Sequence, residues 1–197
     1  MALIQVTGEE LATVVTTLEM RERPRPRPFP GSALRLVPWK LPPPHRYRTL
    51  FARVGSPWLW FSRLAMIDAQ LTAVIHDPAI AIFAAVDAGG IEVGMLELDF
   101  RQPRVCTLAY LGLVPGWTGK GHGRWLMGHA LALGWRPGVE WVQVNTCTLD
   151  HPSALGFYRA SGFVPVARTI ETFPDPRISG LLPRDAAPQV PLLASRR

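Results

Sequence analysis

Between residues 79 and 173, apolar segments of strand length alternate with segments of helix length, and this alternation leaves few folds open to the chain. In chain order, the expected elements are a strand pair over 79–100 joined by the turn DAGG, a strand over 105–114, a helix over 123–135, a strand over 139–148, a helix over 152–162 and a strand over 163–173. Strands that alternate with helices predict an α/β layer structure with a mixed sheet.

The first 78 residues carry weaker signals. Residues 11–20 are rich in β-branched side chains and predict a first strand. Apolar residues at spacings of three and four predict an amphipathic helix within 56–78 that ends before Pro78. Between these segments, 21–30 and 37–46 are dense in proline, which resists regular structure. With 197 residues, 48% of them hydrophobic, the chain is long enough for one domain with a substantial core.

The charge balance favours anionic partners. There are 21 lysine and arginine residues against 15 aspartate and glutamate residues, a formal net charge of +6. The basic residues cluster at Arg21, Arg23, Arg25 and Arg27, and again at Arg46, Arg48 and Arg53. Because no helix-turn-helix, zinc-finger or RNA-recognition signature accompanies them, we interpret these clusters as solvated segments rather than as a nucleic-acid-binding surface.

Several other classes find no support in the sequence. The longest apolar run, residues 79–86, is far shorter than the roughly 18 residues of a membrane span. The first residues lack the pattern of a secretory signal, so we expect a cytoplasmic protein without a membrane partner. Cys106 and Cys147 lie far from any second thiol or histidine pair with metal-ligand spacing, so we expect neither a disulfide nor a metal site.

A glycine-rich loop, GWTGKGHGRW at 116–125, separates a predicted strand from a predicted helix. The Walker A pattern fails because Val114 occupies its first glycine position, and the dinucleotide pattern fails at Arg124. Glycines still let the backbone approach a ligand closely, and a helix N-terminus offers unpaired N–H groups to an anion. With Lys120 and Arg124 adding charge, the loop predicts a phosphate or pyrophosphate site, and a plain strand-to-helix turn is the alternative.

A second motif, HPSALGFYRASGF at 151–163, follows about thirty residues later. Together the two motifs resemble the GNAT superfamily of acyl-CoA-dependent N-acetyltransferases, which carries [QR]-x-x-G-x-[GA] at a helix start and then N-x-x-A-x-x-x-Y-x-x-x-G-F. The matching residues are Gly121, Gly123, Ala154, Tyr158, Gly162 and Phe163. The resemblance covers roughly 91–173 and departs from the pattern at Thr118, where the family has Gln or Arg, and at His151, where it has Asn.

The resemblance implies a mixed, mostly antiparallel central sheet flanked by helices, with strands splayed at the cofactor site. It implies a single domain over 1–197, with a variable substrate-side half (1–78), a cofactor-binding core (79–173) and a C-terminal tail (174–197). Acetyl-CoA would be the acyl donor, and no metal is expected. By similarity, the cofactor-binding residues are Leu111, Leu113, Gly119, Lys120, Gly121, His122, Gly123, Arg124 and His151.

The resemblance also implies a general acid, because the family uses the tyrosine that matches Tyr158 to protonate the departing thiolate. The alternative is that Tyr158 is a half-buried helix aromatic. Thr107 stands where many relatives have a basic carboxylate, which shifts attention to Glu97 and Asp99 on the neighbouring strand. We favour Glu97 as the general base, although both carboxylates may be read as solvated strand residues. His129, on the buried helix, reads as a core histidine.

The sequence therefore predicts an N-acetyltransferase that moves an acetyl group from acetyl-CoA directly to a primary amine in a ternary complex. A module that binds acyl-CoA without catalysis is one alternative, and a nucleic-acid-binding protein that uses the arginine clusters is another. The acceptor, a small molecule or a peptide or protein amine, is left open, as is the acyl group. Exposed strand edges in such folds allow a homodimer.

Overall fold

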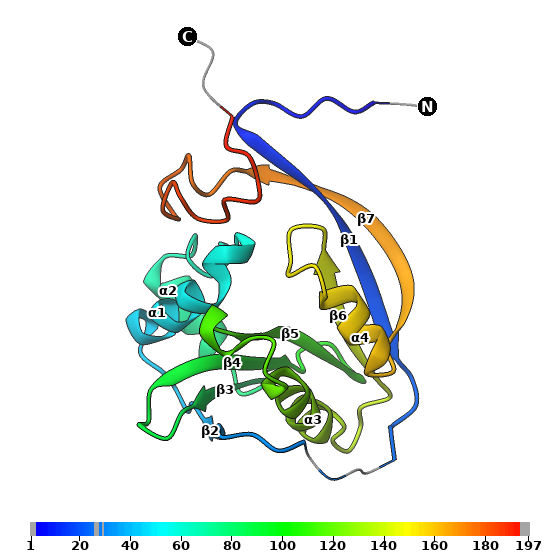
Figure 1. Cartoon of the computed structure of the whole chain (residues 1–197). Coiled ribbons are helices and arrows are strands. Elements are labelled where there is room, and N and C mark those ends of the chain that lie inside the picture. The colour runs from blue at the N-terminus through cyan, green and yellow to red at the C-terminus, as the bar shows by residue number, and fades with distance from the viewer. Residues whose placement is uncertain (1–2, 26–27, 29, 194–197) are drawn as a thin grey trace.

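A computed structural model describes residues 3–25, 28 and 30–193, so Arg27 of the first basic cluster lies outside the described residues. The alternating segments form one seven-stranded sheet in the order β2-β3-β4-β5-β6-β1-β7, with helices on both faces (Figure 1). The strands are β1 (Glu10–Met20), β2 (Arg35–Pro38), β3 (Ile80–Val86), β4 (Glu92–Asp99), β5 (Val105–Leu113), β6 (Trp141–Cys147) and β7 (Val164–Pro174). The helices are α1 (Pro44–Gly55), α2 (Asp68–Ile75), α3 (His122–Gly134) and α4 (Ala154–Ala160), with 3-10 turns η1 (Ser56–Trp58) and η2 (Pro115–Trp117).

Strand direction confirms the predicted mixed, mostly antiparallel sheet. Among the described strands every neighbouring pair is antiparallel except β5 and β6, which run parallel. From β3 to β7 each predicted element is present, with bounds that shift by only a few residues. The turn between β3 and β4 is closed by Asp87, whose side chain accepts the N–H of Ile91, and by Gly90, whose φ of +82° favours glycine.

The helix predicted within 56–78 is present only in the second half of that segment, as α2, which ends before Pro78 as expected. The first half forms η1 and then irregular turns. Leu59 takes a left-handed conformation with a φ of +55°, which ends the 3-10 turn, and Ile67 of the expected apolar stripe is exposed. The apolar residues have the helical spacing of three and four. However, Trp58 contacts His151 and Trp60 contacts Phe51, and a continuous helix would prevent these tertiary contacts.

Two further elements lie where proline density predicted irregular chain. β2 pairs with β3, and α1 begins at Pro44, where the missing proline N–H is not needed because the first helical N–H groups have no partner in the helix. The buried face of α1 is formed by Tyr47, Leu50, Phe51 and Val54, at spacings of three, one and three. This pattern is helical, so the proline-based expectation for 37–46 is corrected here.

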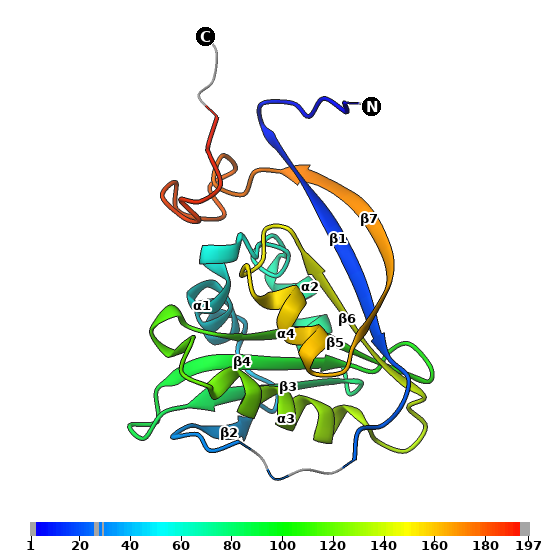
Figure 2. The same ribbon diagram turned by 45° about the vertical axis from the view of Figure 1, so that its right-hand side comes forward.

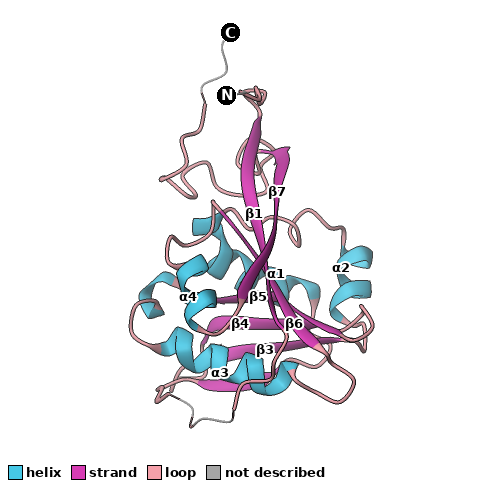
Figure 3. Cartoon of the chain, turned by 90° about the vertical axis from the view of Figure 1, so that its right-hand side faces the viewer, coloured by secondary structure: helices cyan, strands magenta, loops and turns pink. Residues whose placement is uncertain are grey.

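The helices form two layers around the sheet. Helices α3 and α4 cover one face, and α1 and α2 cover the other (Figure 3). Side chains of β4 alternate between the two layers, since Leu96 and Leu98 join the α3 core while Met95 joins the α1 core. Glu97 lies between Leu96 and Leu98 in the sequence, so its side chain is on the other face of β4, as predicted, and points into the α1 layer.

The site depends on where β5 and β6 part. Their parallel pairing runs from Val105 with Trp141 to Leu108 with Val144 and then stops, although both strands continue. Ala109 is an extra residue at this point, because Leu108 pairs with Leu98 and Tyr110 pairs with Glu97 on β4. Such a bulge bends its strand and increases the local twist. Beyond it, β6 turns away to join the long ribbon of β1 and β7 (Figure 2). The predicted splayed strands are thus present.

After β7 the chain returns over the loop that follows α1. Leu182 and Ala187 form a small buried cluster with Leu59, and the side chain of Gln189 donates to the carbonyl of Pro57 at 2.6 Å. The tail therefore packs against the same loop that carries Trp58 and Trp60. No helix among the described residues is both long and apolar enough to cross a membrane.

Candidate active site

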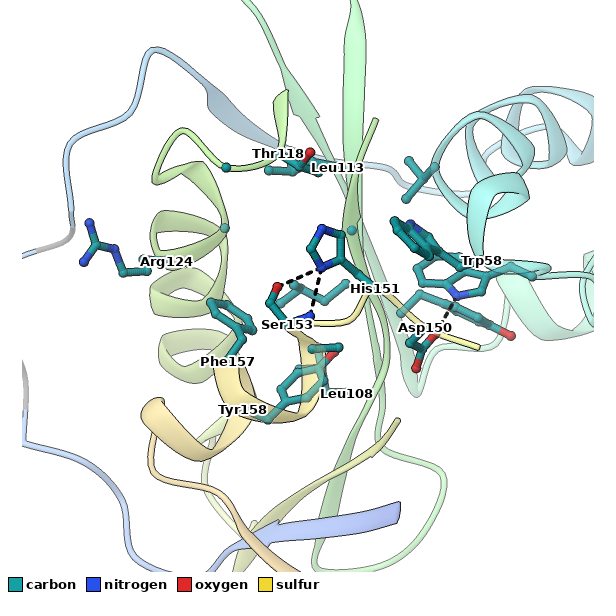
Figure 4. Close-up of a pocket in the computed structure, with 18 of the residues that line it drawn as sticks. Trp58, Leu108, Leu113, Thr118, Arg124, Asp150, His151, Ser153, Phe157 and Tyr158 are labelled. Carbon is teal, nitrogen blue, oxygen red and sulfur yellow. Dashed lines mark hydrogen bonds between the residues drawn. The ribbon is translucent and has the colours of Figure 1, made fainter. Parts of the chain in front are cut away.

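A cavity of about 620 Å³ opens where β5 and β6 part (Figure 4). Its walls come from the loop after α1, the outer half of β5, the glycine loop with the start of α3, the turn after β6, and α4. The sequence-predicted site residues that line it are Tyr158, Leu111, Leu113, Gly119, Gly121, Gly123, Arg124 and His151. Glu97, Lys120 and His122 are not among its lining residues.

The glycine loop presents backbone to this cavity. Gly119 and Gly121 have φ values of +74° and +86°, a region that glycine occupies without strain. Gly121 is the residue before the first turn of α3, and no described side chain caps the helix there. A Cβ atom at Gly119 would meet nothing within 4 Å, so the space beside the loop is open. Unpaired N–H groups and the positive end of the α3 dipole therefore face a volume that suits an anion.

The polar side chains of the loop point elsewhere. The hydroxyl of Thr118 donates to the carbonyl of Pro115 at 2.8 Å, and the Lys120 ammonium donates to the carbonyl of Gly116 at 2.8 Å. His122 hydrogen-bonds through Nδ1 with Ser32 at 2.8 Å. The guanidinium of Arg124 extends away from the centre of the cavity (Figure 4). The loop therefore presents mainly backbone groups to the cavity, with Arg124 at its edge beside Gly121.

Tyr158 lies on α4 with its ring buried against Phe157 and Phe163. No hydrogen bond to another described residue holds its hydroxyl, and Tyr158 is one of the residues that line the cavity. Burial raises the pKa of Tyr158 well above its usual value, and the negative charge of Asp150 raises it further. The phenol is therefore a proton-bearing donor throughout the neutral range.

Asp150 is a lining residue that sequence reasoning missed. Its Oδ2 accepts the Thr146 hydroxyl at 2.8 Å and the Cys147 N–H at 2.9 Å, and its Oδ1 accepts the indole N–H of Trp60 at 3.3 Å. These contacts fix the carboxylate at the end of β6 beside the cavity. The sequence offered one signal for Asp150, its position directly before the second motif, but the motif does not predict where the Asp150 side chain points.

His151, where the family has Asn, forms a compact turn with Ser153. Its Nδ1 accepts the Ser153 N–H at 3.1 Å and lies 2.8 Å from the Ser153 hydroxyl. Because Nδ1 accepts an N–H, the proton of the neutral ring is assigned to Nε2. The ring packs edge-on against Trp58 with centroids 4.9 Å apart. His151 thus presents a donor to the cavity, as an asparagine amide would.

Glu97 is fully enclosed, with 0% of its surface exposed. Its Oε1 accepts from the Arg63 guanidinium at 2.6 Å and its Oε2 accepts the Tyr47 hydroxyl at 2.5 Å. Burial and the charge of Glu97 raise the pKa of Tyr47 well above its usual value, so this phenol stays a donor. Asp99, the second carboxylate considered as a base, pairs with Arg101 nearer the surface. Neither carboxylate is brought to the cavity lining.

The wall opposite the glycine loop is aromatic. The rings of Trp60 and Tyr110 lie 5.1 Å apart, and Phe51 packs behind both at 5.6 and 4.9 Å. Trp60 fits because two neighbours lack side chains: a Cβ atom on Gly55 would collide with it, and one on Gly112 would come within 3.2 Å of its ring. The position of Trp60 is therefore fixed by close packing. Among the described residues, no three His, Cys, Asp or Glu side chains gather as a metal site requires.

Comparison with known proteins agrees with this geometry. The model of the acetyltransferase (GNAT) family matches residues 42–163. The chain belongs to this family of acetyltransferases. The matched range includes β5 and β6, the two strands that part at the cavity.

Solved structures resemble the fold at low sequence identity. A GCN5-related N-acetyltransferase from Sphaerobacter thermophilus has a TM-score of 0.63 and 15% identity over 83% of this chain and 52% of its own. A GNAT-family protein from Novosphingobium aromaticivorans has a TM-score of 0.57 and 14% identity, over 86% and 68%. An aminoglycoside acetyltransferase from an uncultured soil sample, solved with sisomicin, has a TM-score of 0.53 and 16% identity, over 66% and 87%. The chain spans about half the length of the first of these, and no curated protein matches it.

Proposed function

We propose that the chain is an N-acetyltransferase that moves an acetyl group from acetyl-CoA directly to a primary amine within a ternary complex. The observation that carries this proposal is the meeting of three features in one cavity: the uncapped start of α3, the free edge of β5 and the side chain of Tyr158. We extend the proposal to the whole chain as a single catalytic unit.

The two ends of acetyl-CoA have different partners in this arrangement. The pyrophosphate would lie against the N–H groups of the loop from Gly119 to Gly123. The pantetheine arm would lie along β5, whose backbone on this side has no strand partner after Leu108. Its amides can pair with the groups near Leu111 and Leu113 as an added strand would. Neither the pyrophosphate contact nor the pantetheine contact needs the longer Gln or Arg side chain that the family has at the position of Thr118.

Acetyl-CoA supplies a thioester, and the amine must attack its carbonyl carbon as a free base. A C–N bond forms, the C–S bond breaks, and the sulfur leaves with the electron pair. Tyr158 gives its proton to this thiolate and recovers one from solvent. Because burial and Asp150 hold its pKa high, Tyr158 carries the proton at neutral pH, before the thiolate forms.

The general-base role of Glu97 stays a prediction. Its carboxylate is engaged by Arg63 and Tyr47 and does not line the cavity, so the amine proton reaches it only through an intervening carrier. Tyr110, which pairs with Glu97 across the strands and whose hydroxyl lies 2.6 Å from Ser62, is the lining residue that separates them. Proton loss to water is the route that needs no such carrier.

Replacement of Tyr158 by Phe tests the proposal. We expect kcat to fall by about 100-fold to 10,000-fold, the usual worth of a general acid, while calorimetric titration with acetyl-CoA gives nearly the same Kd. The matched control is Ser161→Ala, which removes a hydroxyl from the end of the same helix, where it donates to the carbonyl of Phe157. Unchanged turnover in Tyr158→Phe contradicts the acid role, and failure of the unaltered protein to bind acetyl-CoA contradicts the function.

A further inference from the structure

The end of the cavity away from the glycine loop combines aromatic rings with one carboxylate. Trp58 and Asp150 lie together on the side opposite Arg124 (Figure 4). Trp60 and Tyr110 complete this end, which we name the acceptor wall: Trp58, Trp60, Tyr110 and Asp150. Since the glycine loop and the free edge of β5 suit the donor, the acceptor wall is where the second substrate meets it.

The acceptor wall carries one negative charge, that of Asp150. Asp150 is the one carboxylate among the described residues that line the cavity, and the lining cation, Arg124, extends away at the other end. A carboxylate offers about four lone-pair positions, and Asp150 uses two on Oδ2 and one on Oδ1. Oδ1 therefore retains one position for a donor that enters the cavity.

Asp150 is also near the reacting end, because its charge acts on Tyr158. An ammonium group on Oδ1 would lie beside the indole N–H edge of Trp60, which donates to the same oxygen, so Asp150 supplies the charge contact and the aromatic rings face the apolar body. The ring of Trp60 is held by packing, since Gly55 and Gly112 leave no more room than it fills. A wall that is apolar and fixed favours an apolar body behind the ammonium group and penalises polar groups left without partners there.

We propose that the acceptor is an amine that carries one positive charge on an apolar body, with its ammonium group on Asp150 and its body against the tryptophans of the acceptor wall. The bound ammonium group gives one proton to water, and its nitrogen then attacks the thioester carbon as the free base. This inference rests on the proposed function, of which it names the substrate class. A polyamine or aminoglycoside would bring further charges to a wall that has no second carboxylate for them, and an amino sugar would bring hydroxyls to an aromatic surface.

Binding is measured first, without turnover. The protein is saturated with CoA, which cannot acylate, and titrated calorimetrically at neutral pH with 2-phenylethylamine, spermidine or glucosamine. We expect 2-phenylethylamine to bind at least about tenfold more tightly than the other two. Spermidine tests the single charge and glucosamine tests the apolar body. Equal or tighter binding of either one overturns the inference.

Variants then test the residues. Asp150→Asn removes the charge and keeps an oxygen for the N–H of Cys147, and we expect it to weaken 2-phenylethylamine about tenfold or more. The matched control, Asp68→Asn, removes the same charge from the exposed start of α2, where Asp68 pairs with Arg48, and should leave this Kd within about twofold. Trp58→Ala, a half-buried ring without a hydrogen bond among the described residues, should weaken binding even if Asp150→Asn folds poorly. An unchanged Kd in both cavity variants overturns the inference.

Turnover separates this inference from the function on which it rests. CoA release from acetyl-CoA is followed with the same three amines. If spermidine or glucosamine is acetylated as efficiently as 2-phenylethylamine, the substrate class is wrong and the acetyltransferase function stands. If 2-phenylethylamine binds as described but no amine releases CoA, the site for an apolar monoamine stands and the proposed function fails.

Discussion

Gly121 combines a left-handed backbone with a place at the start of α3. A side chain there is strained, and a negative one would stand where the proposed pyrophosphate lies. We expect Gly121→Glu to abolish acetyl-CoA binding in calorimetric titration. The matched control is Gly116→Glu, which places the same charge in the same loop at a glycine whose added Cβ meets nothing within 4 Å. A Gly121→Glu protein that binds as well as the control rules out the backbone cradle.

The buried pair of Arg63 and Glu97 makes a second prediction at this scale. Glu97→Gln leaves a guanidinium buried without its counter-charge, which typically costs about 3–5 kcal/mol of the free energy of unfolding. Arg63→Met combined with Glu97→Gln removes both charges, and we expect a smaller loss. Urea unfolding followed by tryptophan fluorescence measures both. If the double variant is less stable than Glu97→Gln alone, the unpaired charge of Arg63 is not the cause of the lost stability.

Residues such as Gly121 and Tyr158 could be predicted because their roles impose short-range spacing that a motif records. Asp150 and Trp60 could not, because their hydrogen bond joins residues 90 positions apart and appears only once β6 and the loop after α1 are folded. Lys120 fits the pattern of a phosphate ligand in the sequence, yet its ammonium bonds to the loop's own carbonyl. Charge and proximity in sequence do not fix the direction of a flexible side chain.

At the scale of elements, the sequence predicts the second half of the fold better than the first. From β3 to β7 the strands and helices are bounded by prolines, glycines and a tight turn, so local chemistry defines them. The segment from 56 to 78 has the period of a helix throughout but forms an α-helix only at α2, because Leu59 and the tryptophans beside it follow tertiary contacts. Helix α1 was obscured by prolines that occupy only its first turn.

The C-terminal tail is held by a salt bridge between Asp175 and Arg177, both nearly fully buried, and Arg177 also donates to the carbonyl of Val190 at 2.7 Å. Since the tail packs on the loop of the acceptor wall, its docking supports the cavity. We expect Arg177→Met to release the tail, because it leaves the Asp175 carboxylate buried with the backbone N–H of residue 177 but without its counter-charge. Hydrogen exchange measures this as lost protection at Leu182, whose N–H donates to the carbonyl of Pro176, with the amides of β4 as internal control.

The same salt bridge predicts a pH dependence. Burial alone would raise the pKa of Asp175, but the hydrogen bonds and charge of Arg177 outweigh it and lower the pKa below its ordinary value of about 3.9. A lowered folded-state pKa means that the carboxylate stabilises the docked tail above that value and loses this effect as the pH falls through the folded-state pKa. Tail protection, referred to intrinsic exchange rates, should stay constant from neutral pH to about pH 4 and fall below it. A loss of protection near neutral pH would contradict this account.

At the scale of the whole molecule, part of the ribbon of β1 and β7 extends beyond the helical layers (Figure 3). On β7, Val164, Val166 and Ile170 are 62%, 52% and 62% exposed. Val14, which pairs with Ile170, is also exposed on this ribbon. β7 is in addition an edge strand of eleven residues, and long exposed edges of this kind tend to pair with another chain.

We therefore expect the chain to form a homodimer through β7, a state that the sequence allowed without specifying. Ile170→Lys places a charge on the exposed apolar surface and should shift the protein to the monomer in sedimentation velocity over a concentration series. The control, Ile91→Lys, adds the same charge at an exposed isoleucine in the turn between β3 and β4. Because β7 contributes no residue to the cavity lining, both variants should bind acetyl-CoA like the unaltered chain. A monomer at every concentration, or a dimer that persists in Ile170→Lys, would show that this surface is not where two copies meet.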